Sequence, residues 1–133
     1  MSERSLKLKQ RLRQGETTFG AWLTVANPTI AEIMAGAGFD WVFIDTEHGG
    51  FSNEGFQTCL MAFNGSPTVP MTRVAWNDHV LIKQALDMGA EGILIPMVSS
   101  AEEARIAVSA CKYPPEGTRG FGPRRASDYG RKT

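Results

Sequence analysis

The sequence predicts an α/β fold, a partial TIM (β/α)₈ barrel with about four βα units of a parallel barrel. Short β-branched and aromatic runs alternate with stretches of helical apolar spacing, and glycines or prolines separate the two. The expected strand centres lie 20, 28 and 23 residues apart, which suits successive right-handed βα units. The 133 residues fit a single domain over 1–133, which by surface scaling buries about two-thirds of its unfolded surface.

The first two strands follow a leader segment. Leucines among basic residues predict a short amphipathic helix within residues 1–15, with its basic face in solvent. The first strand is expected over 19–25. An Asn-Pro pair at 27–28 predicts a helix N-cap followed by proline at the first helical position, and Gly38 ends that helix before the strand at 41–45. The apolar stripe expected on this helix is Ile30, Ile33, Met34 and Ala37.

The later elements repeat the same order. The sequence predicts a helix over 53–63, capped by Ser52 or Asn53, and then a strand over 69–75. The next helix is capped at Asn77-Asp78 and closes at Gly89, before a strand over 92–96. A last helix begins with the capping box Ser100-x-x-Glu103 and runs to Cys111. The βα units therefore span 19–111. The tail, 112–133, is rich in glycine, proline and arginine and is expected to be a loop.

Four βα units are half of a (β/α)₈ barrel, which needs eight units and usually about 250 residues. A sheet of four parallel strands exposes two edges. Three arrangements follow: the chain pairs with another half-barrel, settles as an open α/β sandwich, or is a fragment of a longer protein.

Composition narrows the function classes. The chain has 14 Lys and Arg against 14 Asp and Glu, so it lacks the basic excess of a nucleic-acid-binding protein. No apolar run is long enough to predict a signal peptide or a membrane span. Cys59 and Cys111 show no metal-binding or redox spacing and are expected to be reduced thiols, which favours a cytoplasmic location.

The strongest functional signal is the segment that ends the strand at 41–45. Asp45, Glu47 and His48 follow an apolar run, and residues past the carboxyl ends of parallel strands line the ligand crevice of α/β folds. Arg73, near the end of the third strand, is expected on the same rim. A histidine beside carboxylates suits a general base, and an arginine suits binding of a carboxylate or an enolate oxygen. The alternative is a capped turn with a surface histidine.

Other candidates are weaker. His79 follows the Asn77-Asp78 cap and is expected on the helix surface. Asp87 lies near a helix end where its charge is unfavourable for the macrodipole, which suggests a partner elsewhere. The glycine-rich run at 117–122 resembles an anion-binding loop. It does not follow a predicted strand, however, as the glycine-rich turn of a dinucleotide-binding site must. The tail arginines are expected in solvent; they are Arg124, Arg125 and Arg131.

Several motifs occur in an order that identifies a family. They are Gly20-Ala-Trp22-Leu, Gly38 to Gly49 with its Asp45-Thr-Glu47-His48 core, Arg73-Val-Ala-Trp76-Asn-Asp78, Ile82-Lys-Gln-Ala-Leu-Asp87, Ile95-Pro96-Met97-Val and Lys112-Tyr-Pro-Pro115. With them the chain resembles the amino-terminal half of the HpcH/HpaI aldolases. These are class II, divalent-metal-dependent pyruvate aldolases that cleave or form 4-hydroxy-2-oxoacids, with relatives that act on 2-dehydro-3-deoxyglucarate or in macrophomate synthesis.

The resemblance implies roles for individual residues. His48 matches the catalytic base, and Arg73 matches the arginine that holds pyruvate and stabilises its enolate. Asp87 matches an aspartate that raises the basicity of the histidine across a subunit contact, which implies a homo-oligomer. Asp45 and Glu47 match acidic residues around a metal-bound water. Trp22 matches a substrate-binding wall of the pocket.

The resemblance also implies a cofactor, Mg²⁺ or Mn²⁺ or else Co²⁺. The family's metal ligands, a Glu and an Asp after later strands, have no match in this chain, so no metal ligand is assigned. Asp45 and Glu47 alone would make a thin oxygen shell.

Three interpretations remain open. The first is an aldolase that splits 4-hydroxy-2-oxoacids into pyruvate and an aldehyde, without nucleic-acid or membrane partners. The second is a truncated, inactive half-barrel that serves as a remnant or an interaction module. The third is an incomplete chain.

Overall fold

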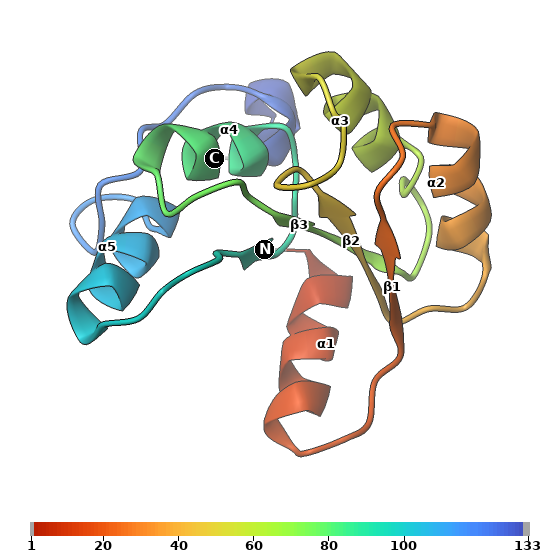
Figure 1. The fold of residues 1–133 in the computed structure, drawn as a ribbon, viewed down its shortest axis with the longest axis horizontal. Helices are drawn as coiled ribbons and strands as arrows, with labels where there is room; N and C mark the ends of the chain where they lie inside the picture. Colours follow the sequence, from red (N-terminus) through yellow and green to blue (C-terminus); the bar gives the residue numbers. More distant parts are fainter. Residues whose placement is uncertain (1, 132–133) are drawn as a thin grey trace.

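The computed structural model describes residues 2–131, in which a parallel four-stranded sheet carries helices on one face (Figure 1). The strands lie in chain order, β1-β2-β3-β4, and every neighbouring pair is parallel. The strands are β1 (Gly20–Leu23), β2 (Trp41–Asp45), β3 (Val69–Arg73) and β4 (Ile93–Leu94). The helices are α1 (Glu3–Arg13), α2 (Pro28–Gly36), α3 (Asn53–Met61), α4 (His79–Asp87) and α5 (Ala101–Cys111). The predicted βα order is confirmed.

Local sequence signals begin these helices. Each N-cap side chain accepts a hydrogen bond from a backbone N–H in the first turn, which satisfies donors that the helix itself leaves free. The caps of α1 to α5 are Ser2, Asn27, Ser52, Asp78 and Ser100. Ser100 also completes the predicted capping box with Glu103. The first, third and fourth strands are shorter than the sequence predicted, while β2 matches its predicted bounds.

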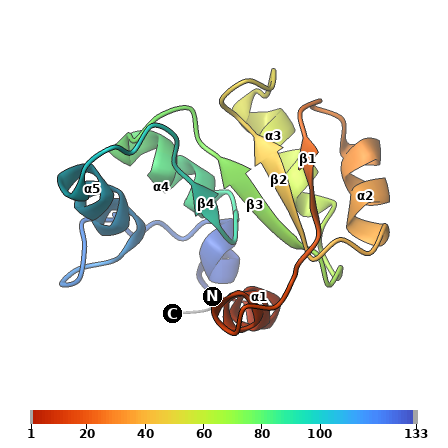
Figure 2. The ribbon, with the colours of Figure 1, turned by 60° about the horizontal axis from the view of Figure 1, so that its bottom comes forward.

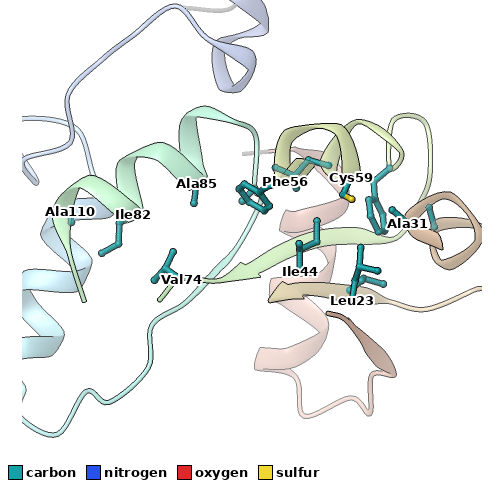
Figure 3. Packing of buried hydrophobic residues seen from close by; sticks show 14 residues of the cluster. Leu23, Ala31, Ile44, Phe56, Cys59, Val74, Ile82, Ala85 and Ala110 are labelled. Atoms are coloured by element: carbon teal, nitrogen blue, oxygen red, sulfur yellow. The ribbon is translucent and has the colours of Figure 1, made fainter. Parts of the chain in front are cut away.

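Alternation along the strands gives the sheet two different faces. Leu23, Val42 and Ile44 point to the side covered by α2 to α5, and their side chains are almost fully buried in the core (Figure 3). The opposite side, here called the inner face, carries Trp22, Trp41, Phe43 and Met71 of the three longer strands, and Leu94 of β4. Figure 2 shows α1 on this opposite side of the sheet, away from the other four helices.

Two predictions about surfaces were wrong. Of the stripe predicted on α2, only Met34 packs against the core, while Ile30, Ile33 and Ala37 are exposed. The buried residues are Ala31 and Ala35, because the helix turns its small residues toward the sheet. The basic side of α1 is not wholly in solvent. Arg4 pairs with Glu91 at 2.7 Å and donates a hydrogen bond to the carbonyl oxygen of Phe63, also at 2.7 Å.

The tail also departs from a simple loop. A short 3₁₀ helix, η1 (Arg125–Gly130), follows irregular backbone, although Asp128 and Tyr129 within it have positive φ angles. Arg125, which was expected in solvent, donates hydrogen bonds to the carbonyl oxygens of Leu60 and Met88. The tail thereby contacts the ends of α3 and α4.

Within residues 2–131, none of the helices has the length and apolar character needed to cross a membrane.

Candidate functional site

The candidate site lies at the carboxyl ends of β2 and β3, where Asp45 and Arg73 pair in register. The Asp45 carboxylate accepts two hydrogen bonds from the Arg73 guanidinium, from Nε at 2.9 Å and from Nη2 at 2.6 Å. Its Oδ1 also accepts the backbone N–H groups of Glu47 and His48, at 3.1 and 3.3 Å. Asp45 is only 2% exposed, so this carboxylate is a buried and fully engaged centre of the site.

This hydrogen bonding sets the ionisation of the pair. The guanidinium of Arg73, together with the two backbone N–H groups, holds the pKa of Asp45 below its usual range against the opposing effect of burial. Asp45 in turn raises the pKa of Arg73. Both side chains are therefore charged at neutral pH.

A tight turn after β2 directs Glu47 and His48 to the rim. The N–H of Gly49 donates to the carbonyl oxygen of Asp45 at 3.0 Å, and a Cβ at position 49 would lie 2.2 Å from that same oxygen. Only glycine fits this close approach. The Thr46 hydroxyl donates to the Arg73 carbonyl oxygen at 2.7 Å, which fastens the turn to β3.

Glu47 lies between the arginine and the histidine. Its Oε2 is 3.0 Å from Arg73 Nε, an ion pair without hydrogen-bond geometry, so this buried oxygen has no hydrogen bond within residues 2–131. Its Oε1 is 3.8 Å from His48 Nε2. The His48 side chain is 73% exposed, which leaves the imidazole open to an incoming molecule.

Aromatic side chains form the floor below Arg73. The guanidinium carbon lies 4.8 Å from the centroid of the Trp22 ring, a cation–π contact that orients the arginine. Trp22 stacks on Phe43 with 5.1 Å between ring centroids, and Phe43 contacts Trp41 edge-on at 5.2 Å. Phe43 was not among the predicted site residues. Its position two residues before Asp45, and so on the same face of the strand, was the available signal.

The structure brings together five of the six predicted site residues, and the sixth lies elsewhere. Asp87, at the end of α4, accepts a hydrogen bond from Arg119 Nη2 at 2.9 Å. Arg119 is buried and lies over the Tyr113 ring at 4.7 Å. No hydrogen bond or ion pair joins Asp87 to His48 in the part of the chain that the structure describes.

The sequence did not predict Arg119 as the partner of Asp87, because its segment, 117–122, showed only a weak likeness to an anion loop. The anion it binds is Asp87 of the same chain. The imidazole of His79 lies beside this segment, with Nε2 3.1 Å from the carbonyl oxygen of Thr118, as suits a helix-surface histidine.

The residues present do not form a complete metal site. No group of three or more His, Cys, Asp or Glu side chains is placed to hold an ion among residues 2–131. Asp45 and Glu47 already face Arg73, and two carboxylates engaged by a guanidinium leave too few oxygens for a hard cation. The two-carboxylate shell considered from the sequence therefore does not fit a resident Mg²⁺ or Mn²⁺.

Comparison with known proteins gives the family. The model of the HpcH/HpaI aldolase/citrate lyase family matches residues 18–130. The chain belongs to this family. The 4-hydroxy-2-oxo-heptane-1,7-dioate aldolase of Salmonella dublin is 50% identical over 114 residues, which are 86% of this chain and 43% of that protein. This HpcH/HpaI-family chain thus spans less than half the length of that relative.

Solved structures of family members share the fold. A HpcH/HpaI aldolase/citrate lyase family protein from Burkholderia cenocepacia J2315 superposes with a TM-score of 0.87 at 34% identity, over 94% of this chain and 52% of that one. A HpcH/HpaI aldolase from Desulfitobacterium hafniense DCB-2 gives 0.82 at 35% identity, over 92% and 48%. Macrophomate synthase gives 0.78 at 31% identity, over 90% and 41%. The fold is that of about half of a TIM-barrel-like aldolase.

Proposed function

We propose that this chain carries the proton-transfer and carboxylate-binding half of a class II pyruvate aldolase, which reversibly cleaves 4-hydroxy-2-oxoacids to pyruvate and an aldehyde. The observation that carries the proposal is the placement of Arg73 and His48 about the Glu47 carboxylate at the carboxyl end of a parallel sheet. Membership of an aldolase family supports it.

Arg73 is the substrate-binding group. Asp45 occupies its Nε and one side of Nη2, and Nη1 has no hydrogen-bond partner among residues 2–131. Nη1 donates to the carboxylate or the 2-oxo oxygen of the substrate, and the positive charge stabilises the enolate that forms when the carbon–carbon bond breaks. Trp22, below the guanidinium, forms a wall of the same pocket.

His48 is the base. In the cleavage direction its imidazole takes the proton of the 4-hydroxyl group, the bond between C3 and C4 breaks, and the aldehyde departs. The electron pair of that bond becomes the pyruvate enolate, and the His48 imidazolium then returns its proton to C3, which leaves pyruvate and a neutral imidazole. Glu47, 3.8 Å away, stabilises the imidazolium between these steps. The aldehyde and the 2-oxoacid are both small molecules, and the site needs neither nucleic acid nor a membrane.

Asp87 acts on His48 only in a homo-oligomer. Within one chain Asp87 binds Arg119, so its proposed effect on the basicity of the histidine requires a second subunit that brings the two together. The divalent ion that the family uses would polarise the 2-oxo group, but this chain's own residues do not supply its ligands. We also propose a cytoplasmic location, because Cys59 and Cys111 are free thiols and thiols stay reduced in that compartment.

The first test is exchange of the pyruvate methyl protons for deuterium in the presence of Mg²⁺ or Mn²⁺, followed by mass spectrometry. The wild-type chain is expected to exchange and His48→Ala to lose exchange, because the proposal makes the His48 imidazole the group that carries the proton. His79→Ala, a change at an exposed histidine that contacts Thr118 instead, is the matched control and retains exchange.

Two results contradict the proposal. If wild type shows no exchange with either ion, the alternative function, an inactive half-barrel, replaces it; the absence of three grouped ligands in residues 2–131 favours that alternative. If His48→Ala exchanges as fast as wild type, His48 is not the base.

A further inference from the structure

Among the described residues, 2–131, α1 is the only helix on the inner face of the sheet. Trp22 is 43% exposed, and Trp41, Phe43 and Met71 are only partly buried, whereas their neighbours on the helix-covered face are almost inaccessible. The groove between this face and α1 is lined by apolar groups of Leu8, Leu12, Val69 and Met71 and has a volume near 340 Å³.

A parallel sheet is stable in proteins almost only when both of its faces are covered. Here α2 to α5 cover one face (Figure 2). On the other face the side chains of Trp22, Trp41 and Phe43 remain partly exposed. In the described part of the chain, β1 and β4 each pair along one edge only, so their remaining N–H and C=O groups are free to extend the sheet. Within residues 2–131, the inner face therefore lacks most of its apolar cover, and each edge strand lacks a second neighbour.

We propose that the inner face and the free edges of β1 and β4 bind a second half-barrel of parallel βα units, the carboxy-terminal half of an enzyme of this family. The superposition of 94% of this chain on 52% of the Burkholderia cenocepacia protein leaves an unmatched remainder of similar length, which is the size that this occupant needs. The strands of this chain are all parallel, and a (β/α)₈ barrel continues that direction through its other half. This inference concerns assembly and does not rest on the proposed catalysis.

The inner-face side chains argue against a second copy of this chain as the occupant. The interior of an eight-stranded barrel holds three layers of four side chains, mostly branched aliphatic residues. This half alone brings Trp22, Trp41, Phe43 and Met71. A second copy would double this set of large residues and overpack the interior, which is destabilising. The fitting partner supplies smaller aliphatic side chains.

Two further features, helix α1 and the charged residues at the rim, also argue against a second copy of this chain as the occupant. Leu8 of α1 packs beside Val69 and Met71, so α1 already lies at the inner side of the sheet. A two-fold axis through a closed barrel would bring a second α1 to the same place, although such a helix is about 10 Å wide. It would also bring two copies of Asp45 and Glu47 to one rim. Four carboxylates would then face only the two guanidinium groups of Arg73, which leaves an excess of negative charge.

The test is co-expression of this chain with the segment of the Salmonella dublin relative that follows the 114 matched residues, with an affinity tag on that segment only. Sedimentation analysis of the purified material is expected to show a 1:1 complex. In a Trp76→Phe background the remaining tryptophans, Trp22 and Trp41, both lie on the inner face, so their emission shifts to shorter wavelength on binding.

Matched variants locate the contact. Met71→Lys places a charge on the inner face and is expected to weaken the complex about tenfold or more, because the charge must be desolvated. Ile33→Lys makes the same kind of change on the exposed side of α2 and leaves the affinity unaltered. Circular dichroism of each variant checks that it is folded.

Three results overturn the proposal. One is the absence of a complex after co-expression. Another is a dimer of this chain that gives the same emission shift without the second segment, which makes a second copy the occupant. The third is an equal effect of Met71→Lys and Ile33→Lys on the complex.

Discussion

Asp45 shows how one residue organises the candidate site. It joins the ends of two strands through Arg73 and orders the turn that carries Glu47 and His48. An arginine within an apolar strand needs an anion, and the structure supplies this anion from the same chain. Among residues 2–131, the Nη1 side of the guanidinium has no hydrogen-bond partner, and the proposed function assigns this side to the substrate.

Acid should weaken the protein through Asp45. Its native pKa is lowered by Arg73, so its ionised form stabilises the fold fully above the unfolded pKa of about 3.9, and this contribution is lost as the pH falls through the native pKa. Urea unfolding at pH 6 and pH 3 is expected to show a smaller loss for Asp45→Asn than for wild type, because the amide does not titrate. Equal losses would mean that Asp45 makes no contribution to the acid sensitivity.

At the scale of elements, arginines fasten α1 and the tail to the βα units. Arg4 holds α1 through Glu91 and the carbonyl oxygen of Phe63. Arg125 holds the tail through the carbonyl oxygens of Leu60 and Met88, and burial lowers the pKa of its guanidinium. In both places a forked donor adds hydrogen bonds to carbonyl oxygens at or just past helix ends, where the last carbonyl groups have few intrahelical partners.

Removing the Arg125 contact should release the tail without disturbing the sheet. Arg125→Met leaves the carbonyl oxygens of two helix ends without this donor, so the free energy of unfolding is expected to fall by about 1–3 kcal/mol. Hydrogen exchange should speed up in η1 and little in β2. Arg124→Met, at an exposed neighbouring arginine, is the control. If both variants showed the same hydrogen exchange in η1, the Arg125 contact would not be what holds the tail.

At the scale of the whole molecule, the core lies on one side of the sheet only. The residues buried between the sheet and α2 to α5 form one cluster that runs from Leu23 on β1 to Ala110 on α5 (Figure 3). The inner face adds aromatic contacts but remains partly in water. The stability of the chain on its own thus depends on the helix-covered side.

Two isoleucines test this one-sided core. Ile82 on α4 is 0% exposed and Ile33 on α2 is 66% exposed. Ile82→Ala is expected to lower the free energy of unfolding by about 2–5 kcal/mol, and Ile33→Ala by less than about 0.5 kcal/mol. Chemical denaturation monitored by circular dichroism measures both. If the two variants lost similar free energies of unfolding, Ile82 would not be packed in the core as the structure shows.

The sequence alone determined the order of elements, the parallel sheet and most helix starts, because these depend on local patterns: caps such as Asn27 and Ser100, apolar runs, and glycine stops. It also predicted that Asp45, Glu47, His48 and Arg73 would share a rim, since parallel strands end on the same edge.

Only the tertiary structure decided which charges pair and which apolar residues are buried. Asp87 with Arg119, Arg125 with two helix ends, and the exposed Ile33 all depend on contacts between segments distant in sequence, or on which side of a helix meets the sheet. A periodic pattern marks a helix but leaves its rotation open when small residues such as Ala31 can pack more closely than large ones.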